Sequence, residues 1–173
     1  PAATNVITAG GTFSAPAGVV INAADGTIDL DLSTAGGPYA IKYVTSDPCK
    51  DSTTFNITIN PTEDAAFGYA TTSYCTNDTD PTPTFITEPG GTFSEITGNI
   101  NVNNSGVIDI STSSVGSYYV VYTTGGPCPE SDSIQITITP VDDPFFDYPQ
   151  AAYCQGDIDP AATNVLTAGG TFS

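Results

Sequence analysis

The chain lacks histidine, arginine, methionine and tryptophan, and its only cations are Lys42 and Lys50. Without histidine it has neither the commonest general base nor the commonest neutral metal ligand. With 2 basic residues against 19 acidic ones, the net charge is −17, which excludes binding to nucleic acid and to anionic lipid. No apolar run approaches the roughly 18–20 residues of a membrane helix, so we expect no direct membrane insertion.

What the chain does have is a repeat. Residues 1–14 and 160–173 are nearly identical, and both end in Gly-Gly-Thr-Phe-Ser. A diverged copy occupies residues 81–94, so the three copies begin at positions 1, 81 and 160. A fixed period of about 80 residues indicates tandem structural units. We therefore expect the chain to be a stretch of a longer array.

Apolar and polar residues alternate with the period of β-strands. Residues 54–60 and their counterparts 133–139 alternate strictly, as half-buried strands do. Further matched strands are predicted at 39–43 and 118–122, which are rich in aromatic and β-branched residues, and at 27–30 and 107–110. Glycine-containing turns at 24–26 and 104–106 precede the last pair. Many short strands at even spacing predict an all-β sandwich or barrel.

A proline followed by an acidic pair marks the predicted domain boundaries, at 61–64 and again at 140–143. Proline cannot donate to a sheet, and paired carboxylates do not pack in a core. We therefore predict three parts. Residues 1–62 form a unit that lacks its first strand, residues 63–141 form a complete unit, and residues 142–173 form the N-terminal part of a third.

The four cysteines are of two kinds. Cys49 and Cys128 each follow a proline and lie one period apart, and Cys75 and Cys154, also one period apart, each follow a tyrosine. We predict a Cys75–Cys128 disulfide, which closes a loop of about 53 residues and stabilises the fold by roughly 4 kcal/mol in the chain-entropy model. Cys49 and Cys154 would then pair outside the chain, in an oxidising compartment.

Other states of the cysteines stay open. The rival pairing joins Cys49 to Cys75 and Cys128 to Cys154 across the domain boundaries. Four free buried thiols are a further alternative, and a zinc site is less favoured because the spacings are wide and histidine is missing. The Cys75–Cys128 bridge is preferred because it lets each unit fold independently.

Carboxylates gather around the predicted junctions and before the following proline. Ca²⁺ takes 6–8 oxygen ligands, so these residues are candidate calcium ligands that would stiffen a joint. The candidates are Glu63, Asp64, Asp78, Asp80, Asp142, Asp143, Asp157 and Asp159. The alternative is that they are solvated turn residues whose side chains bond to the backbone. No other cofactor is implied, and a pair of carboxylates duplicated in every small unit does not point to an enzyme.

Six short motifs recur in a constant order: Tyr-Cys, Asp-x-Asp-Pro, Gly-Gly-Thr-Phe-Ser, Gly-x-Ile-Asp, Gly-x-Tyr-x-x-x-Tyr and Pro-Cys. This series resembles the Ig-like (PKD-like) repeats of giant cell-surface adhesins of gliding Bacteroidetes, the SprB-like filament proteins. The resemblance covers the whole chain. It implies immunoglobulin-like β-sandwich repeats with this period, joined end to end, export by the type IX route, and a place in an extracellular filament for surface attachment and gliding.

The resemblance also implies partners and modifications. The partners would be neighbouring repeats of the same chain and an extracellular surface or polysaccharide. Ser52 and Ser133 each follow an aspartate and match the Asp-Ser/Thr-x sequon for O-glycosylation in that bacterial group. Two other functions stay open: a carbohydrate-binding Ig-like module of a secreted multidomain protein, and a polymer built by strand donation between separate subunits.

Overall fold

The computed structural model describes residues 1–46, 48–166 and 169–171, and these residues form β-strands, one turn of 3-10 helix and no α-helix. The predicted all-β class is therefore confirmed. None of the described helical segments is long and apolar enough to cross a membrane. The chain divides into two compact units, the first made of Pro1–Asp64, Glu88–Gly90 and Thr124–Glu130, the second of Ala65–Thr87, Gly91–Thr123 and Ser131–Ser173.

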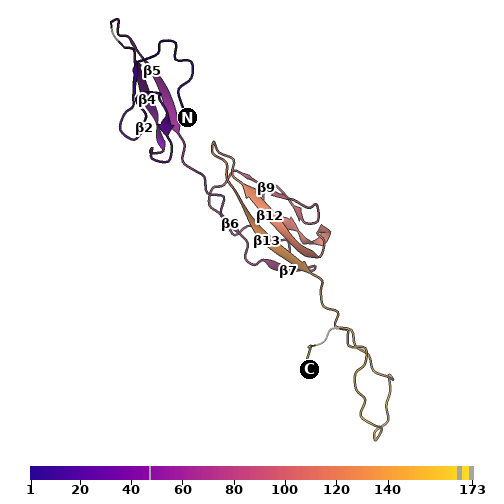
Figure 1. Cartoon of the computed structure of the whole chain (residues 1–173). Helices are drawn as coiled ribbons and strands as arrows, with labels where there is room; N and C mark the ends of the chain where they lie inside the picture. Colours follow the sequence, from indigo (N-terminus) through magenta and orange to yellow (C-terminus); the bar gives the residue numbers. More distant parts are fainter. Residues whose placement is uncertain (47, 167–168, 172–173) are drawn as a thin grey trace. The chain divides into compact units, whose positions relative to one another are not determined.

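The first unit is built on one three-stranded antiparallel sheet (Figure 1). Its strands, in the order β1-β4-β5, are β1 (Thr12–Ser14), β4 (Gly36–Val44) and β5 (Ser52–Ile59). A short hairpin of β2 (Val20–Ile21) and β3 (Ile28–Asp29) accompanies the sheet. The small core consists of Phe13, Ile28 and Ile41.

The second unit has a larger sheet in the order β7-β13-β12-β9. Its strands are β7 (Ser73–Cys75), β9 (Thr92–Glu95), β12 (Gly116–Thr123) and β13 (Ser131–Thr139). All neighbours are antiparallel except β7, which runs parallel to β13. Two short antiparallel pairs complete the unit: β6 (Phe67–Gly68) with β8 (Phe85–Ile86), and β10 (Asn101–Val102) with β11 (Ile108–Asp109), which continues into the 3-10 turn η1 (Ile110–Thr112).

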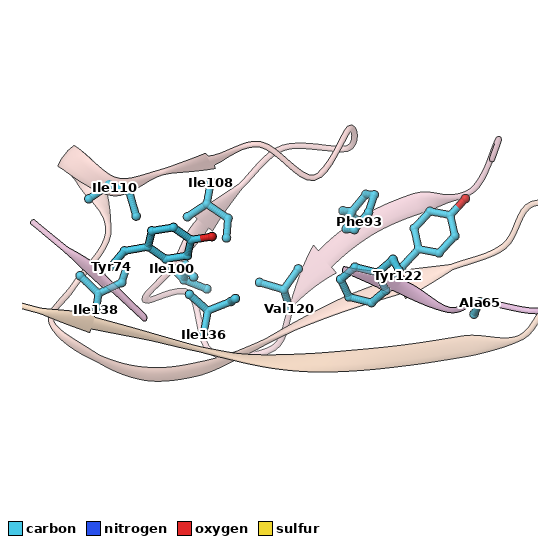
Figure 2. Packing of buried hydrophobic residues seen from close by; sticks show 11 residues of the cluster. Ala65, Tyr74, Phe93, Ile100, Ile108, Ile110, Val120, Tyr122, Ile136 and Ile138 are labelled. Atoms are coloured by element: carbon cyan, nitrogen blue, oxygen red, sulfur yellow. The ribbon is translucent and has the colours of Figure 1, made fainter. Parts of the chain in front are cut away.

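The core of the second unit lies between these layers. Figure 2 shows Ile108 and Ile110 on one side and Val120, Ile136 and Ile138 of the large sheet on the other. These five side chains are almost completely inaccessible to water. Alternation along β12 and β13 puts every second residue into this core, and the architecture is a β-sandwich-like all-β fold.

Residues one period apart make the same contacts in the two units. The Gly11 amide donates to the Tyr43 hydroxyl at 2.9 Å, and the Gly91 amide donates to the Tyr122 hydroxyl at 2.8 Å. The ring centroids of Phe13 and Tyr43 are 4.5 Å apart, and those of Phe93 and Tyr122 are 4.6 Å apart. The Gly-Gly-Thr-Phe-Ser motif thus supplies both the amide and the ring that hold the second tyrosine of the Gly-x-Tyr-x-x-x-Tyr motif.

A β-bulge in the first unit explains why the period is not constant along the chain. Gly116 and Tyr118 of β12 pair with Ile138 and Ile136 without interruption. In the first unit the register shifts between Gly36 and Tyr39, which pair with Ile59 and Ile57. β4 therefore takes up one extra residue in the bulge, and the residues on either side keep their partners.

The turn glycines Gly26 and Gly106 are needed for two reasons. Their φ angles are +72° and +83°, a region that disfavours residues with a Cβ atom. A Cβ atom on Gly26 would lie 3.0 Å from the Phe13 ring, and one on Gly106 would lie 2.9 Å from the Phe93 ring. Each glycine therefore lets the turn before β3 or β11 close over the core phenylalanine.

The two cores should differ in their tolerance of a cavity. Ile108 is 0% exposed and its counterpart Ile28 is 9% exposed. We expect Ile108→Ala to lower the free energy of unfolding of the second unit by about 4 kcal/mol, and Ile28→Ala to lower that of the first unit by about 2 kcal/mol. Urea titration followed by far-ultraviolet circular dichroism measures both values. Equal losses would contradict the difference in packing.

Candidate functional site

An apolar groove with a volume of about 730 Å³ lies in the first unit. Its lining is mostly aromatic and aliphatic and includes Phe13, Ile28, Ile41, Tyr43, Phe55 and Ile57. Phe55 is 73% exposed, although it belongs to the central part of β5. The first unit therefore exposes apolar surface along this groove.

In the second unit, β6 and β7 cover the residues equivalent to the lining of this groove. The Phe67 ring of β6 lies 5.1 Å from Phe93 and 6.0 Å from Tyr122, the counterparts of Phe13 and Tyr43. The Tyr69 hydroxyl donates to the Gly106 carbonyl at 2.6 Å. The groove of the first unit thus corresponds to the place that β6, β7 and the residues around them occupy in the second unit.

The cysteines do not form the predicted bridge. Cys75 pairs with Thr139 at the C-terminal end of β13, whereas Cys128 precedes Ser131 at the N-terminal end of that strand. The 9 residues of β13 span about 26 Å, and the three residues from Cys128 to Ser131 recover at most about 11 Å. Bridged cysteines have Cα atoms within about 7 Å, so this register keeps Cys75 and Cys128 apart.

All four cysteines are free thiols, and three of them, Cys49, Cys75 and Cys154, are exposed. The rival pairs Cys49–Cys75 and Cys128–Cys154 stay predictions, and the alternative of four buried thiols does not describe the exposed cysteines. No group of three or more cysteine or acidic side chains suited to a metal ion occurs among the described residues.

The candidate calcium ligands are not gathered into one site. Asp78 and Asp157, which lie one period apart, each accept a hydrogen bond of 2.7 Å from the amide of Cys75 or Cys154, three residues earlier. Asp80 accepts from the Ile110 amide at 3.0 Å and holds η1. Asp143 accepts from the Phe145 amide at 2.9 Å. Asp78, Asp143 and Asp157 thus bond to amides within three residues, whereas the partner of Asp80 lies 30 residues away.

The remaining candidates lie in the linkers and near the C-terminus. Asp64, Asp142 and Asp159 are exposed. Glu63 accepts from the amides of Gly126 and Cys128 at 3.1 and 3.0 Å. Hydrogen bonds from the Thr124 side chain and from the Cys128 and Gly126 amides lower the pKa of Glu63. The Glu63 carboxylate can therefore order the loop that contains Gly126 and Cys128. Calcium binding stays a prediction.

The candidate glycosylation sites are accessible. Ser52 and Ser133 are exposed, and each amide donates at 2.7 Å to the carboxylate of the aspartate before it. The shared geometry presents both hydroxyls on strands, β5 and β13. Their modification stays a prediction.

Sequence reasoning missed the groove and the part played by Glu63. The hydrogen bond between Glu63 and the Cys128 amide joins two residues that lie far apart in the sequence. No local sequence pattern indicates this bond. In comparisons with known proteins, the chain matches no protein-family model and no curated protein sequence.

The thiols should be detectable directly. We expect four thiols per chain to react with a chromogenic disulfide reagent in denaturant without prior reduction, because all four are free. In the folded chain, Cys128 should react more slowly than the three exposed cysteines. Peptide mapping under non-reducing conditions checks the pairing, and a Cys75–Cys128 peptide would contradict the register of β7 on β13.

Glu63 should order the loop of residues 124–130. We expect Glu63→Gln to speed hydrogen exchange at the Gly126 and Cys128 amides, because the amide side chain accepts more weakly than the carboxylate. Glu130→Gln, which removes another acid of the same loop, is the matched control. In the folded chain the pKa of Glu63 lies below its ordinary value of 4.5, so its contribution is complete above that pH and is lost as the pH falls through the folded pKa. Equal exchange in both variants would contradict this role.

Proposed function

We propose that the chain is a run of tandem immunoglobulin-like repeats in the shaft of a long extracellular adhesive filament, with no catalytic role. The observation that carries the proposal is the recurrence of the same contacts one period apart. The glycine–tyrosine bond links Gly11 to Tyr43 and Gly91 to Tyr122, and the cysteine–aspartate turn occurs at both Cys75 and Cys154. A series of equivalent units suits length and stiffness better than a single active centre.

An immunoglobulin-like topology is supported by the first tyrosine of the Gly-x-Tyr-x-x-x-Tyr motif. The Tyr118 hydroxyl donates to the Val115 carbonyl at 2.9 Å, and the Tyr39 hydroxyl donates to the Thr34 carbonyl at 3.1 Å. A tyrosine bonded to the backbone a few residues upstream is a recurrent feature of such sandwiches. The chain departs from antibody domains because it has no tryptophan and no bridge between its sheets.

The exposed sheet face supports a shaft more than a carbohydrate-binding module. Within residues 65–141, Tyr119 is the one tyrosine whose side chain is exposed, at 51%. Around it the face carries small hydroxyl pairs, Ser117 with Thr137 at 2.9 Å and Thr123 with Ser131 at 2.8 Å. Sugar binding usually uses several aromatic rings together, and this face offers one.

The remaining parts of the proposal rest on the family resemblance. They are export by the type IX route, a position on the cell surface, contact with an extracellular surface or polysaccharide, and participation in gliding. O-glycosylation at Ser52 and Ser133 would add bulk to exposed strands and protect them from proteases.

The filament proposal can be tested on intact cells of the source organism. Antibodies raised against the chain should decorate extended surface filaments in immunogold electron microscopy, with gold particles at many positions along each filament because the repeat recurs. The matched control is the same antibody preabsorbed with the chain. Label confined to the cell interior would overturn the proposal. Specific retention on a polysaccharide matrix, lost in Tyr119→Ala, would favour the carbohydrate-binding module.

A further inference from the structure

The first and last strands of the large sheet in the second unit are neighbours and run in the same direction (Figure 1). β7 pairs with the C-terminal end of β13, so that Ser73 lies beside Thr137 and Cys75 beside Thr139. The other neighbouring strands of this sheet are antiparallel. The chain therefore enters the sheet along β7 and leaves it along β13, with the two strands side by side and parallel.

This direction decides how the sheet is loaded when the chain is pulled from both sides of the unit. Tension on the preceding segment draws β7 back toward its first residue, and tension on the following segment draws β13 forward past its last residue. Because the strands are parallel, the two pulls act along them in opposite directions. The hydrogen bonds lie across the strands, so the load falls on all of them at once, and they must break together.

Thr76 closes the C-terminal end of the β7–β13 ladder with two hydrogen bonds. Its amide donates to the Thr139 carbonyl at 3.0 Å, and its hydroxyl accepts from the Val141 amide at 3.3 Å. The Thr139 hydroxyl in turn donates to the Tyr74 carbonyl at 3.3 Å. The contact between the two strands is thus stronger than the three residues of β7 alone indicate.

A backbone bond and a buried ring hold the other part of the ladder. The Thr137 amide donates to the Thr72 carbonyl at 2.8 Å. Tyr74 of β7 is 7% exposed, and its ring belongs to the core that Figure 2 shows. β7 cannot slide along β13 without drawing this ring out of the core, which exposes apolar surface to water and adds to the resistance.

We propose that β7 and β13 form a mechanical clamp that keeps the second unit folded under tension along the chain. β6 pairs with β8 through two residues only, so it detaches first and leaves the large sheet intact. The unit then unfolds when the bonds between residues 72–76 and β13 break together. Only the source of the tension rests on the filament proposal, because a shaft that is held at both ends is loaded in this direction.

Thr76→Pro is the variant that weakens the clamp most directly. It removes both the amide that bonds to Thr139 and the hydroxyl that bonds to Val141. The position itself suits proline, because the Asp78 amide donates to the Cys75 carbonyl at 2.9 Å and Thr76 is the second residue of that turn. The turn should therefore persist while the clamp loses two bonds.

Single-molecule force spectroscopy of the full chain, held by peptide tags at its two termini, tests the proposal. Rupture of the clamp releases residues 73–139, about 23 nm of chain, whereas the sheet of the first unit, residues 12–59, releases about 15 nm. We expect Thr76→Pro to raise the rate of the longer event at constant force at least about tenfold. Thr139→Val, which loses only the hydroxyl bond to Tyr74, should raise it about threefold.

Two controls separate the clamp from proline effects and from overall stability. Gln155→Pro places proline in the equivalent turn outside the clamp, where the Asp157 amide donates to the Cys154 carbonyl at 3.0 Å, and should leave the rate unchanged. Val120→Ala opens a cavity on β12, which is not a neighbour of β7. We expect it to lower the urea midpoint more than Thr76→Pro does and to raise the rate under force less, because the core around Val120 is still packed when the clamp breaks.

The ranking of the variants decides the outcome. The proposal is supported if Thr76→Pro and Thr139→Val speed the longer event more than Val120→Ala does. It is overturned if neither clamp variant changes that rate, or if the rates under force follow the urea midpoints instead. A failed clamp leaves the filament role untouched, because immunogold labelling reads where the chain is and not how it bears load. A failed labelling experiment likewise leaves the force measurement intact.

Discussion

The packing of one phenylalanine from the first strand against the phenylalanine–tyrosine pair of the large sheet is the contact on which a complete unit depends. Phe67 touches both Phe93 and Tyr122, and Tyr69 in the same segment bonds to the turn at Gly106. The first unit keeps the pair Phe13–Tyr43 with almost the same ring spacing. Its core is smaller and more exposed than that of the second unit, although its sheet register is nearly the same.

Much of this fold follows from local sequence. Alternation along residues 54–60 and 133–139 indicated β5 and β13, because one side chain in two faces the core. The turns before Ile28 and Ile108 were also predictable, since only glycine fits both the backbone angle and the phenylalanine beneath it. What repeats in the sequence repeats in the contacts, and the bulge at Gly36 shows that an extra residue shifts the register only locally.

The rest depends on pairings between distant segments. Nothing near Cys75 indicates that β7 runs parallel to β13, yet this direction places Cys75 far from Cys128. The order of the cysteines along the chain suggested a closed loop. The direction of the three-residue strand β7, however, decides at which end of the sheet Cys75 lies. The role of the predicted calcium ligands could not be decided from the sequence either. A carboxylate that bonds to a nearby amide has the same local sequence as one that coordinates a cation.

The acidic residues therefore have two opposite effects on the molecule. Locally, Asp78, Asp80 and Glu63 accept hydrogen bonds from backbone amides, so each negative charge stabilises a particular turn or loop. Globally, a charge of −17 makes any two copies repel each other. A groove that exposes Phe55 and a segment that exposes Phe146 would otherwise invite indiscriminate aggregation. Charge of a single sign opposes such contacts, because any association of two copies must bury enough apolar surface to offset the repulsion between them.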